Sequence, residues 1–158
     1  MNEYKHLRFT LSMPRDTTTG RVLEQMIHPA LIRGGYQFRE QDTIGQKMSG
    51  RKHRVDATID HAEGPMLVSL KWQQTSGTAE EKIPFEIINL MHACQRGPYR
   101  KAYLVLGGID SIPGSKQGGW TLRQWYLSGE LKQFLDYHPL VEILLPDEFV
   151  AKANAGLL

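Results

Sequence analysis

The stretch KHRVDATIDHAEGPMLVSLKWQ, residues 52–73, decides how this chain folds. Its two halves, residues 52–61 and 66–73, both alternate polar and apolar side chains, which is typical of strands with one buried face. Between them, residues 63–65 (Glu-Gly-Pro) have the composition of a tight turn. The stretch therefore predicts two neighbouring strands joined by a turn.

Polar side chains from the two strands are predicted on the same side of the sheet. On the first strand one face comprises Asp56, Thr58 and Asp60, and the other comprises Val55, Ala57 and Ile59. The matching face of the second strand comprises Leu67, Ser69, Lys71 and Gln73. A lysine in mid-strand among Val, Leu and Trp is unfavourable unless it is paired or functional, so Lys71 is the clearest indicator of a site.

Composition indicates a single globular domain. The chain has 158 residues, of which 41% are hydrophobic and 23% charged, so it is long enough to bury a substantial core. The net charge of +2 and the pI of about 8.7 permit nucleic-acid binding without requiring it. A lone cysteine, Cys94, excludes a disulfide framework, and we expect it to be a buried apolar side chain. No signal-peptide pattern or apolar run of membrane length is present, so we expect a cytoplasmic protein with no membrane partner.

Further elements are predicted before this pair of strands. Residues 2–12 form a short strand or an arm that packs on the core or on a second subunit. Residues 21–34 carry an apolar stripe at i, i+3 and i+4 spacing, which predicts a helix that Pro29 kinks or weakens. Residues 36–39 are predicted to form a strand, and the polar residues 41–50 a loop.

After the pair, the pattern predicts a helix and a crossover. Thr78 and Glu81 fit a capping box at the start of this helix. Pro84 leaves two alternatives, a kink in the first turns or a regular helix that begins at Pro84 itself. Residues 101–106 are predicted to be a buried strand, parallel to a neighbour because a helix precedes it.

The last third is predicted to form a loop, a helix, a strand and a terminal helix. Residues 107–119 are rich in glycine and lack the P-loop spacing, so a loop that contacts DNA or a second subunit and a plain surface loop both remain open. Residues 120–137 predict one long helix, which Ser128-Gly129 is able to break. Residues 140–145 predict a short strand, and a helix follows from Pro146.

This order of elements, together with Asp56 and Ser69-Leu70-Lys71, resembles the PD-(D/E)XK nuclease superfamily. In that superfamily an Asp on one strand and a (D/E)-x-K on the next hold divalent metal and activate water against a phosphodiester. The resemblance implies an α/β fold with a restriction-endonuclease-like core, a central mixed sheet of about four to five strands flanked by helices, within one nuclease-like domain over residues 1–158.

Ser69 stands where the superfamily has its second acid. Some restriction endonucleases of the superfamily also have Ser or Cys at this place and take the carboxylate from the following helix. In this chain that helix offers Glu80, Glu81 and Glu86, and we expect Glu86 because its spacing is about that of the family. An acid from the first helix often approaches the metal in the superfamily, which suggests Glu24; a solvated surface Glu is equally compatible with its position.

The resemblance also implies roles for these residues. Mg²⁺, with Mn²⁺ as a substitute, would be held by Asp56, Glu86, the Leu70 carbonyl and Glu24. Lys71 would orient or deprotonate the attacking water and neutralise phosphate charge. Gln73 would hydrogen-bond the phosphate, and the Ser69 hydroxyl would hold a water.

Basic and polar side chains near this site are candidate DNA contacts, because ammonium and guanidinium groups supply most non-specific affinity for phosphates. Solvated surface charges are the equally plain alternative. The candidate DNA-binding residues are Lys47, Arg51, Lys52, Arg54, Lys82, Lys116 and Gln117.

The resemblance predicts a Mg²⁺-dependent DNA endonuclease that is site-specific on duplex DNA and of the restriction or homing type. A junction-resolving nuclease is a close alternative within the same class. A homodimer or higher homo-oligomer would match a palindromic site. Because of Ser69, a non-catalytic DNA-binding or assembly subunit with a degenerate site is the alternative. A third possibility is that the protein is an α/β module with no nucleic-acid role. Asp56 and Lys71 would then form a simple cross-strand ion pair.

Overall fold

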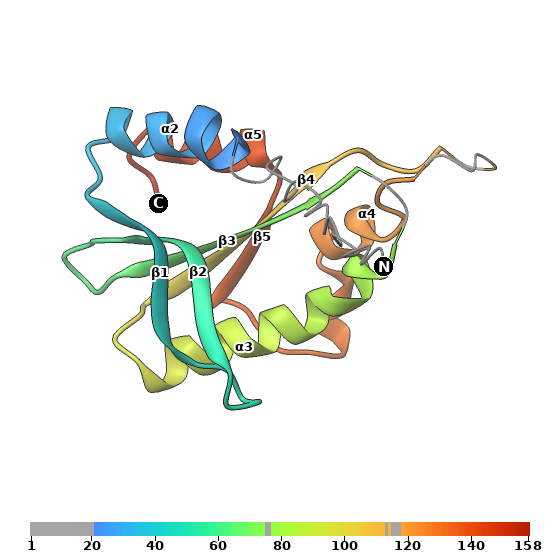
Figure 1. Cartoon of the computed structure of the whole chain (residues 1–158), viewed down its shortest axis with the longest axis horizontal. Helices are drawn as coiled ribbons and strands as arrows, with labels where there is room; N and C mark the ends of the chain where they lie inside the picture. Colours follow the sequence, from blue (N-terminus) through green and yellow to red (C-terminus); the bar gives the residue numbers. More distant parts are fainter. Residues whose placement is uncertain (1–20, 75–76, 113, 115–117) are drawn as a thin grey trace, which may run out of the picture.

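A five-stranded mixed sheet forms the centre of the fold, which is seen here in a computed structural model (Figure 1). The structure describes residues 21–74, 77–112, 114 and 118–158; the predicted arm at residues 2–12 and the candidates Lys116 and Gln117 lie outside them. The strands follow one another in sequence order: β1 Phe38–Gln46, β2 Lys52–Ile59, β3 Met66–Gln73, β4 Lys101–Gly108 and β5 Val141–Leu144. β1, β2 and β3 pair antiparallel, and β3, β4 and β5 pair parallel.

Helices cover both faces of this sheet. On one face lie η1 Leu23–Ile27, α2 His28–Arg33 and α5 Pro146–Asn154. On the other lie η2 Ala79–Lys82, α3 Ile83–Arg96, α4 Arg123–Leu127 and η3 Glu130–Gln133. The predicted α/β architecture and helical crossover between β3 and β4 are confirmed. No helix in the described part of the chain is long and apolar enough to cross a membrane.

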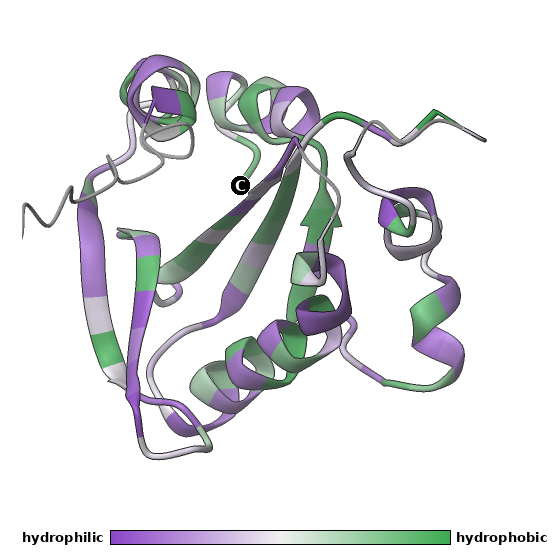
Figure 2. Ribbon diagram, turned by 45° about the vertical axis from the view of Figure 1, so that its right-hand side comes forward, coloured by the Kyte–Doolittle hydropathy of each residue, from purple (hydrophilic) through white to green (hydrophobic). Residues whose placement is uncertain are grey.

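The core is divided into two clusters by the sheet. β4 is buried along almost its whole length, as a parallel strand covered on both faces must be. Tyr103 and Val105 pack toward α5, whereas Leu104 and Leu106 pack toward α3. Figure 2 shows the apolar residues gathered in the central strands, while β1 and β2 carry mostly polar ones. The strands β1 and β2 therefore offer the polar side chains that a functional site needs.

Two predictions at the ends of elements need correction. β1 runs through most of the predicted loop, because pairing with β2 satisfies its polar backbone groups although its side chains are exposed. The predicted capping box does not form: Thr78 makes no side-chain cap, and a 3₁₀ turn precedes α3. Pro84 lies in the first turn of α3, which is the second of the two alternatives.

The single long helix predicted for residues 120–137 is wrong. The chain forms α4 and η3 instead, separated by Gly129 in the left-handed region at φ 81°. At the start, the backbone N–H groups of Thr121 and Leu122 donate to the Glu80 carboxylate at 2.8 and 3.0 Å. A side chain from η2 therefore replaces a regular first turn. The predicted weakening at Pro29 takes the form of a π-helical turn, η1, just before it.

The apolar side chains of β2 point to opposite sides of the sheet before and after Asp56. Ala57 and Ile59 pack beneath α2 and α5, whereas Val55 packs with α3. Across from Asp56, Gln41 of β1 has a left-handed φ of 47°. The prediction that the three apolar side chains share one face is therefore wrong, because the strand turns at Asp56 and carries the rest of the hairpin over α3.

The end of β4 depends on a glycine. Gly108 has a φ of 113°, and a Cβ atom added there would lie 1.9 Å from the carbonyl oxygen of Gln73. Gly45 has a similar φ of 121° with no atom near the position of a Cβ. We expect Gly108→Ala to lower the free energy of unfolding by about 3 kcal/mol and Gly45→Ala by about 1 kcal/mol. Urea unfolding measures both, and equal losses in the two variants would contradict the close contact.

Candidate active site

The site begins where β2 and β3 separate. Their regular pairing runs from Ile59 with Met66 to Ala57 with Val68 and then stops. At the next step the Leu70 backbone N–H donates to Asp56 Oδ2 at 2.6 Å instead of to a strand carbonyl. A side-chain carboxylate thereby completes the backbone hydrogen bonding of a diverging strand.

Glu86 reaches the same place from α3. Ile83, Ile87 and Leu90 bury the sheet-facing side of this helix, and Glu86 lies among them with only 8% of its surface exposed. The Ser69 hydroxyl donates to Glu86 Oε1 at 2.8 Å, and Lys71 Nζ lies 3.7 Å from the same oxygen. β3 has no acid at position 69, and its Ser69 and Lys71 contact Glu86 of α3 instead.

Burial dominates the electrostatics of Asp56, and the charge of Glu86 adds a smaller effect in the same direction. Burial raises the pKa of Asp56, and the negative charge of Glu86 raises it further. The Leu70 N–H, the positive charge of Lys71 and a hydrogen bond from Gln41 Nε2 at 3.3 Å lower it, but the net pKa stays above the ordinary value. A cation bound by Asp56 would favour its charged form and so lower its pKa.

The donor set fits a hard divalent cation. Asp56 and Glu86 supply carboxylate oxygens, and Mg²⁺ prefers oxygen ligands, uses few carboxylates and keeps several waters. The described residues contain no group of three His, Cys, Asp or Glu side chains that could hold a metal. A cation here would therefore take its remaining ligands from water or backbone oxygen atoms. The Leu70 carbonyl as a further ligand stays a prediction.

The other acids that were considered differ in position, and of these Glu81 lines the pocket that Lys71 and Glu86 border. Glu80 is buried, which by itself would raise its pKa, but hydrogen bonds from Thr121 and Leu122 outweigh burial and lower the pKa. Its carboxylate is therefore committed to positioning the start of α4. Glu81 is exposed on η2. Glu24 is exposed on η1, in the helical layer opposite α3, and the described residues show no contact between it and Asp56 or Glu86; its role as a ligand stays a prediction.

Two catalytic candidates on β3 are bound to protein groups. The Ser69 hydroxyl donates to Glu86, and its expected contact with a water stays a prediction. Gln73 is buried and its Nε2 donates to the Gly119 carbonyl at 2.8 Å, while its Oε1 has no partner among the described residues. The amide of Gln73 therefore fixes the loop after β4, and its contact with a phosphate stays a prediction. Lys71 makes its ion pair with Glu86, so the simple Asp56–Lys71 pair is not what the structure shows.

His53 belongs to the basic run before Asp56, but its burial beside the site was not predicted. It is 1% exposed, and its Nε2 has no hydrogen-bond partner in the described part of the chain. Burial lowers its pKa; the charge of Glu86 opposes this shift, and those of Lys47 and Lys71 add to it. Alternation with the buried Val55 could have indicated that His53 points inward.

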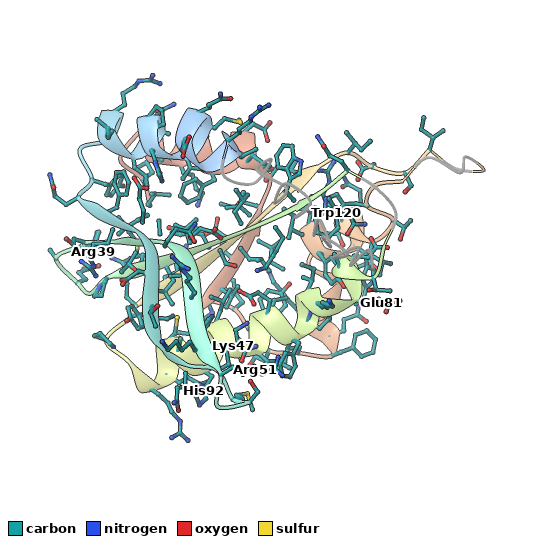
Figure 3. All side chains as sticks on the ribbon, in the orientation of Figure 1. Arg39, Lys47, Arg51, Glu81, His92 and Trp120 are labelled. Carbon is teal, nitrogen blue, oxygen red and sulfur yellow. The ribbon has the colours of Figure 1, made fainter. Side chains whose placement is uncertain are left out.

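The basic hairpin lies beside the carboxylates. Arg51, Lys52 and Arg54 are exposed on β2 or the turn before it, and Arg54 Nε donates to the Gln41 carbonyl at 3.2 Å. Figure 3 shows Lys47 and Arg51 at the end of the hairpin, next to α3. An open pocket of about 440 Å³ lies here, lined by side chains that include Lys47, Lys71, Lys82 and Glu86. Contacts of these residues with DNA stay predictions.

Comparison with known proteins decides the family. The sequence profile of the PD-(D/E)XK nuclease superfamily domain matches residues 15–157. The chain belongs to this superfamily. The predicted resemblance and restriction-endonuclease-like fold are thereby confirmed, and the superfamily is one of nucleases.

One solved structure is also similar to the chain. It is described as "Crystal Structure of Protein of Unknown Function AF1548", and it matches with 9% sequence identity and a TM-score of 0.46. The match covers 78% of this chain and 55% of that one, so the chain spans about half the length of its structural neighbour. No curated protein sequence matches the chain.

The raised pKa of Asp56 predicts a stability effect. A carboxyl whose pKa is higher in the folded state stabilises the fold when protonated, and this stability is lost as the pH rises through the folded pKa. Without divalent metal at pH 7, Asp56→Asn should therefore raise the melting temperature, by about 2–4 °C for roughly 1 kcal/mol in a domain of this size. The gain should vanish below about pH 4, where Asp is also protonated in the unfolded chain.

Thermal scans with and without Mg²⁺ measure this effect, and Asp136→Asn, at an exposed Asp without a salt bridge in the described part of the chain, is the matched control. Mg²⁺ should raise the melting temperature of the wild type and of the control but not of Asp56→Asn. A lower melting temperature for Asp56→Asn than for the control would contradict this account of Asp56.

Proposed function

We propose that the protein is a Mg²⁺-dependent DNA endonuclease that hydrolyses phosphodiester bonds. One observation carries the proposal: Glu86 of α3 is held by Ser69 and Lys71 of β3, beside Asp56 of β2. These groups would serve as the Asp, the lysine and the second carboxylate of a phosphodiester-hydrolysing site of this superfamily. Because Glu86 of α3 would supply this carboxylate, the presence of Ser69 in place of an acid on β3 is compatible with activity.

Asp56 and Glu86 would hold the cation through their carboxylate oxygens. Mg²⁺, when bound, supplies positive charge that offsets the developing charge on the phosphate and makes water a better nucleophile. Asp56 is fixed by the Leu70 N–H and by Gln41, so its carboxylate is oriented before a ligand arrives. Such preorganisation avoids reorganisation during the reaction.

Lys71 would act on the attacking water and on the phosphate. Its ammonium is part exposed, at 42% of its side chain, and it borders the open pocket on one side and Glu86 on the other. In hydrolysis the oxygen of water bonds to phosphorus while the bond from phosphorus to the leaving oxygen breaks. Lys71 would orient that water by hydrogen bonding and offset phosphate charge.

The exposed basic residues of the hairpin would bind the phosphates that flank the cleaved bond. Arg51, Lys52 and Arg54 lie within a few residues of Asp56 in sequence, on the strand that carries it or the turn before it. Contacts of this kind position DNA without reading its sequence. A cytoplasmic homodimer of the restriction or homing type, cutting both strands of duplex DNA at a defined site, completes the proposal.

A non-catalytic DNA-binding or assembly subunit is the second candidate, and Ser69 favours it. Two features argue against this candidate. Asp56 keeps an elevated pKa through burial and the Glu86 charge, which is a cost that a purely structural acid need not bear. Lys71 and Glu86 both open onto a pocket.

Removal of any one of the three central side chains should abolish cleavage. We expect Asp56→Ala, Lys71→Ala and Glu86→Ala each to reduce Mg²⁺-dependent cleavage of plasmid and phage DNA by at least a hundredfold, because each removes charge at the reacting phosphate. Glu130→Ala, which alters an exposed acid on η3, is the control and should cleave like the wild type. Gel electrophoresis of timed digests measures the rates.

The outcomes separate the two candidates. Full activity of Glu86→Ala with loss in Lys71→Ala would keep the nuclease but reject Glu86 as the second acid. If the wild type binds DNA but cleaves no linear, supercoiled or branched substrate with Mg²⁺ or Mn²⁺, the non-catalytic subunit is correct.

A further inference from the structure

The open pocket beside the site extends away from the carboxylates along the first turns of α3. Its wall combines Lys47 from the turn after β1, Lys71 at the end of β3, Lys82 on η2, and Phe85 with Glu86 on α3. Its volume of about 440 Å³ falls within the range of about 300–1,000 Å³ that small-molecule sites occupy. A ligand in this pocket would lie directly next to Lys71 and Glu86.

The charge of the pocket favours an anion. Three lysines line it, against the carboxylates of Glu81 and Glu86. Lys71 lies 3.7 Å from Glu86, whereas Lys47 and Lys82 form no salt bridge among the residues that the structure describes. Two ammonium groups are therefore available for a phosphate at the rim.

An exposed aromatic ring forms the apolar part of the pocket. Phe85 is 53% exposed although it lies on α3 between the buried Ile83 and Ile87. Single exposed apolar side chains are common, and what distinguishes Phe85 is its position in the wall of a pocket that also carries lysines. Every nucleobase has a face that stacks on such a ring, so stacking tolerates any sequence.

The remaining polar group of the wall is already used. Asn89 Nδ2 donates to the Phe85 carbonyl at 3.0 Å, and Asn89 Oδ1 accepts from the Met48 backbone N–H at 3.3 Å. Asn89 therefore ties the hairpin turn to α3 and has little capacity left to read the edge of a base. Recognition in this pocket depends on charge and stacking rather than on base identity.

We infer that this pocket binds one unstacked nucleotide of the substrate strand, next to the phosphate that is cleaved, with its base on Phe85 and its phosphate between Lys47 and Lys82. The inference rests on the proposed nuclease function, because the pocket shares Lys71 and Glu86 with the site. In an intact duplex the nucleotide must leave the base stack to enter, and this costs least for a mismatched or unpaired base. The enzyme should therefore prefer DNA that is locally unpaired beside the cut.

The first arm of the test measures cleavage of duplexes that differ only in the position of one unpaired nucleotide. The wild type should cut beside that nucleotide about tenfold faster or more than it cuts the fully paired duplex, and Phe85→Ala should lose this preference. Phe85→Trp should retain it. Phe134→Ala is the matched control, because Phe134 is also an exposed phenylalanine, at 78%, and lies outside the pocket.

The second arm measures the position of the base without cleavage. It uses Asp56→Asn protein, which keeps every side chain of the pocket, and duplexes in which 2-aminopurine, a fluorescent adenine analogue, replaces the base beside the cut. Its fluorescence rises when it leaves the stack, so binding should increase it. Adding Phe85→Ala should reduce the increase, because the extruded base then has no ring to stack on.

Each outcome decides one claim. Equal rates on paired and unpaired DNA, or an undiminished preference in Phe85→Ala, would overturn the pocket while leaving the nuclease intact. Absence of cleavage by the wild type on every substrate would overturn the proposed function. In that case 2-aminopurine is placed at the unpaired nucleotide instead, and no increase in its fluorescence on binding would overturn the pocket.

Discussion

The fold is organised around the point where β2 and β3 separate at Asp56. A backbone N–H on a diverging strand needs an acceptor, and the Asp56 carboxylate supplies one for Leu70. The same separation lets β2 turn and carry the basic hairpin over α3, with Val55 buried against that helix. One local departure from sheet pairing therefore orients the central carboxylate and brings the hairpin to one wall of the pocket.

The second consequence is that the missing strand acid costs the site little. Ser69 is small and its hydroxyl donates a hydrogen bond, so it leaves room for the longer Glu86 and holds it at 2.8 Å. Lys71 then neutralises part of the Glu86 charge at 3.7 Å. Had an acid occupied position 69, two carboxylates would have faced each other across this contact at the expense of mutual repulsion. Serine on the strand and glutamate on the helix are thus complementary choices.

Much of this could be predicted from the sequence, and the failures have physical reasons. Alternation placed Asp56 and Lys71 on neighbouring strands, whereas Glu86 was expected only because its spacing is about that of the superfamily. Alternation assumes a regular strand, so it could not predict the turn of β2 that follows from the left-handed Gln41 across the sheet. Nor could a local pattern predict that Glu80 caps α4, because its partners lie about forty residues further along the chain.

The most direct test of the central claim exchanges the two side chains of the Ser69–Glu86 contact. If Glu86 supplies the second carboxylate in place of a strand acid, Glu86→Ser should abolish Mg²⁺-dependent DNA cleavage, and Ser69→Glu combined with Glu86→Ser should restore a measurable part of it. The account predicts this recovery because the double variant returns one carboxylate to the same buried contact. Cleavage by Glu86→Ser at the wild-type rate, or a double variant as inactive as the single one despite a native fold, would contradict it.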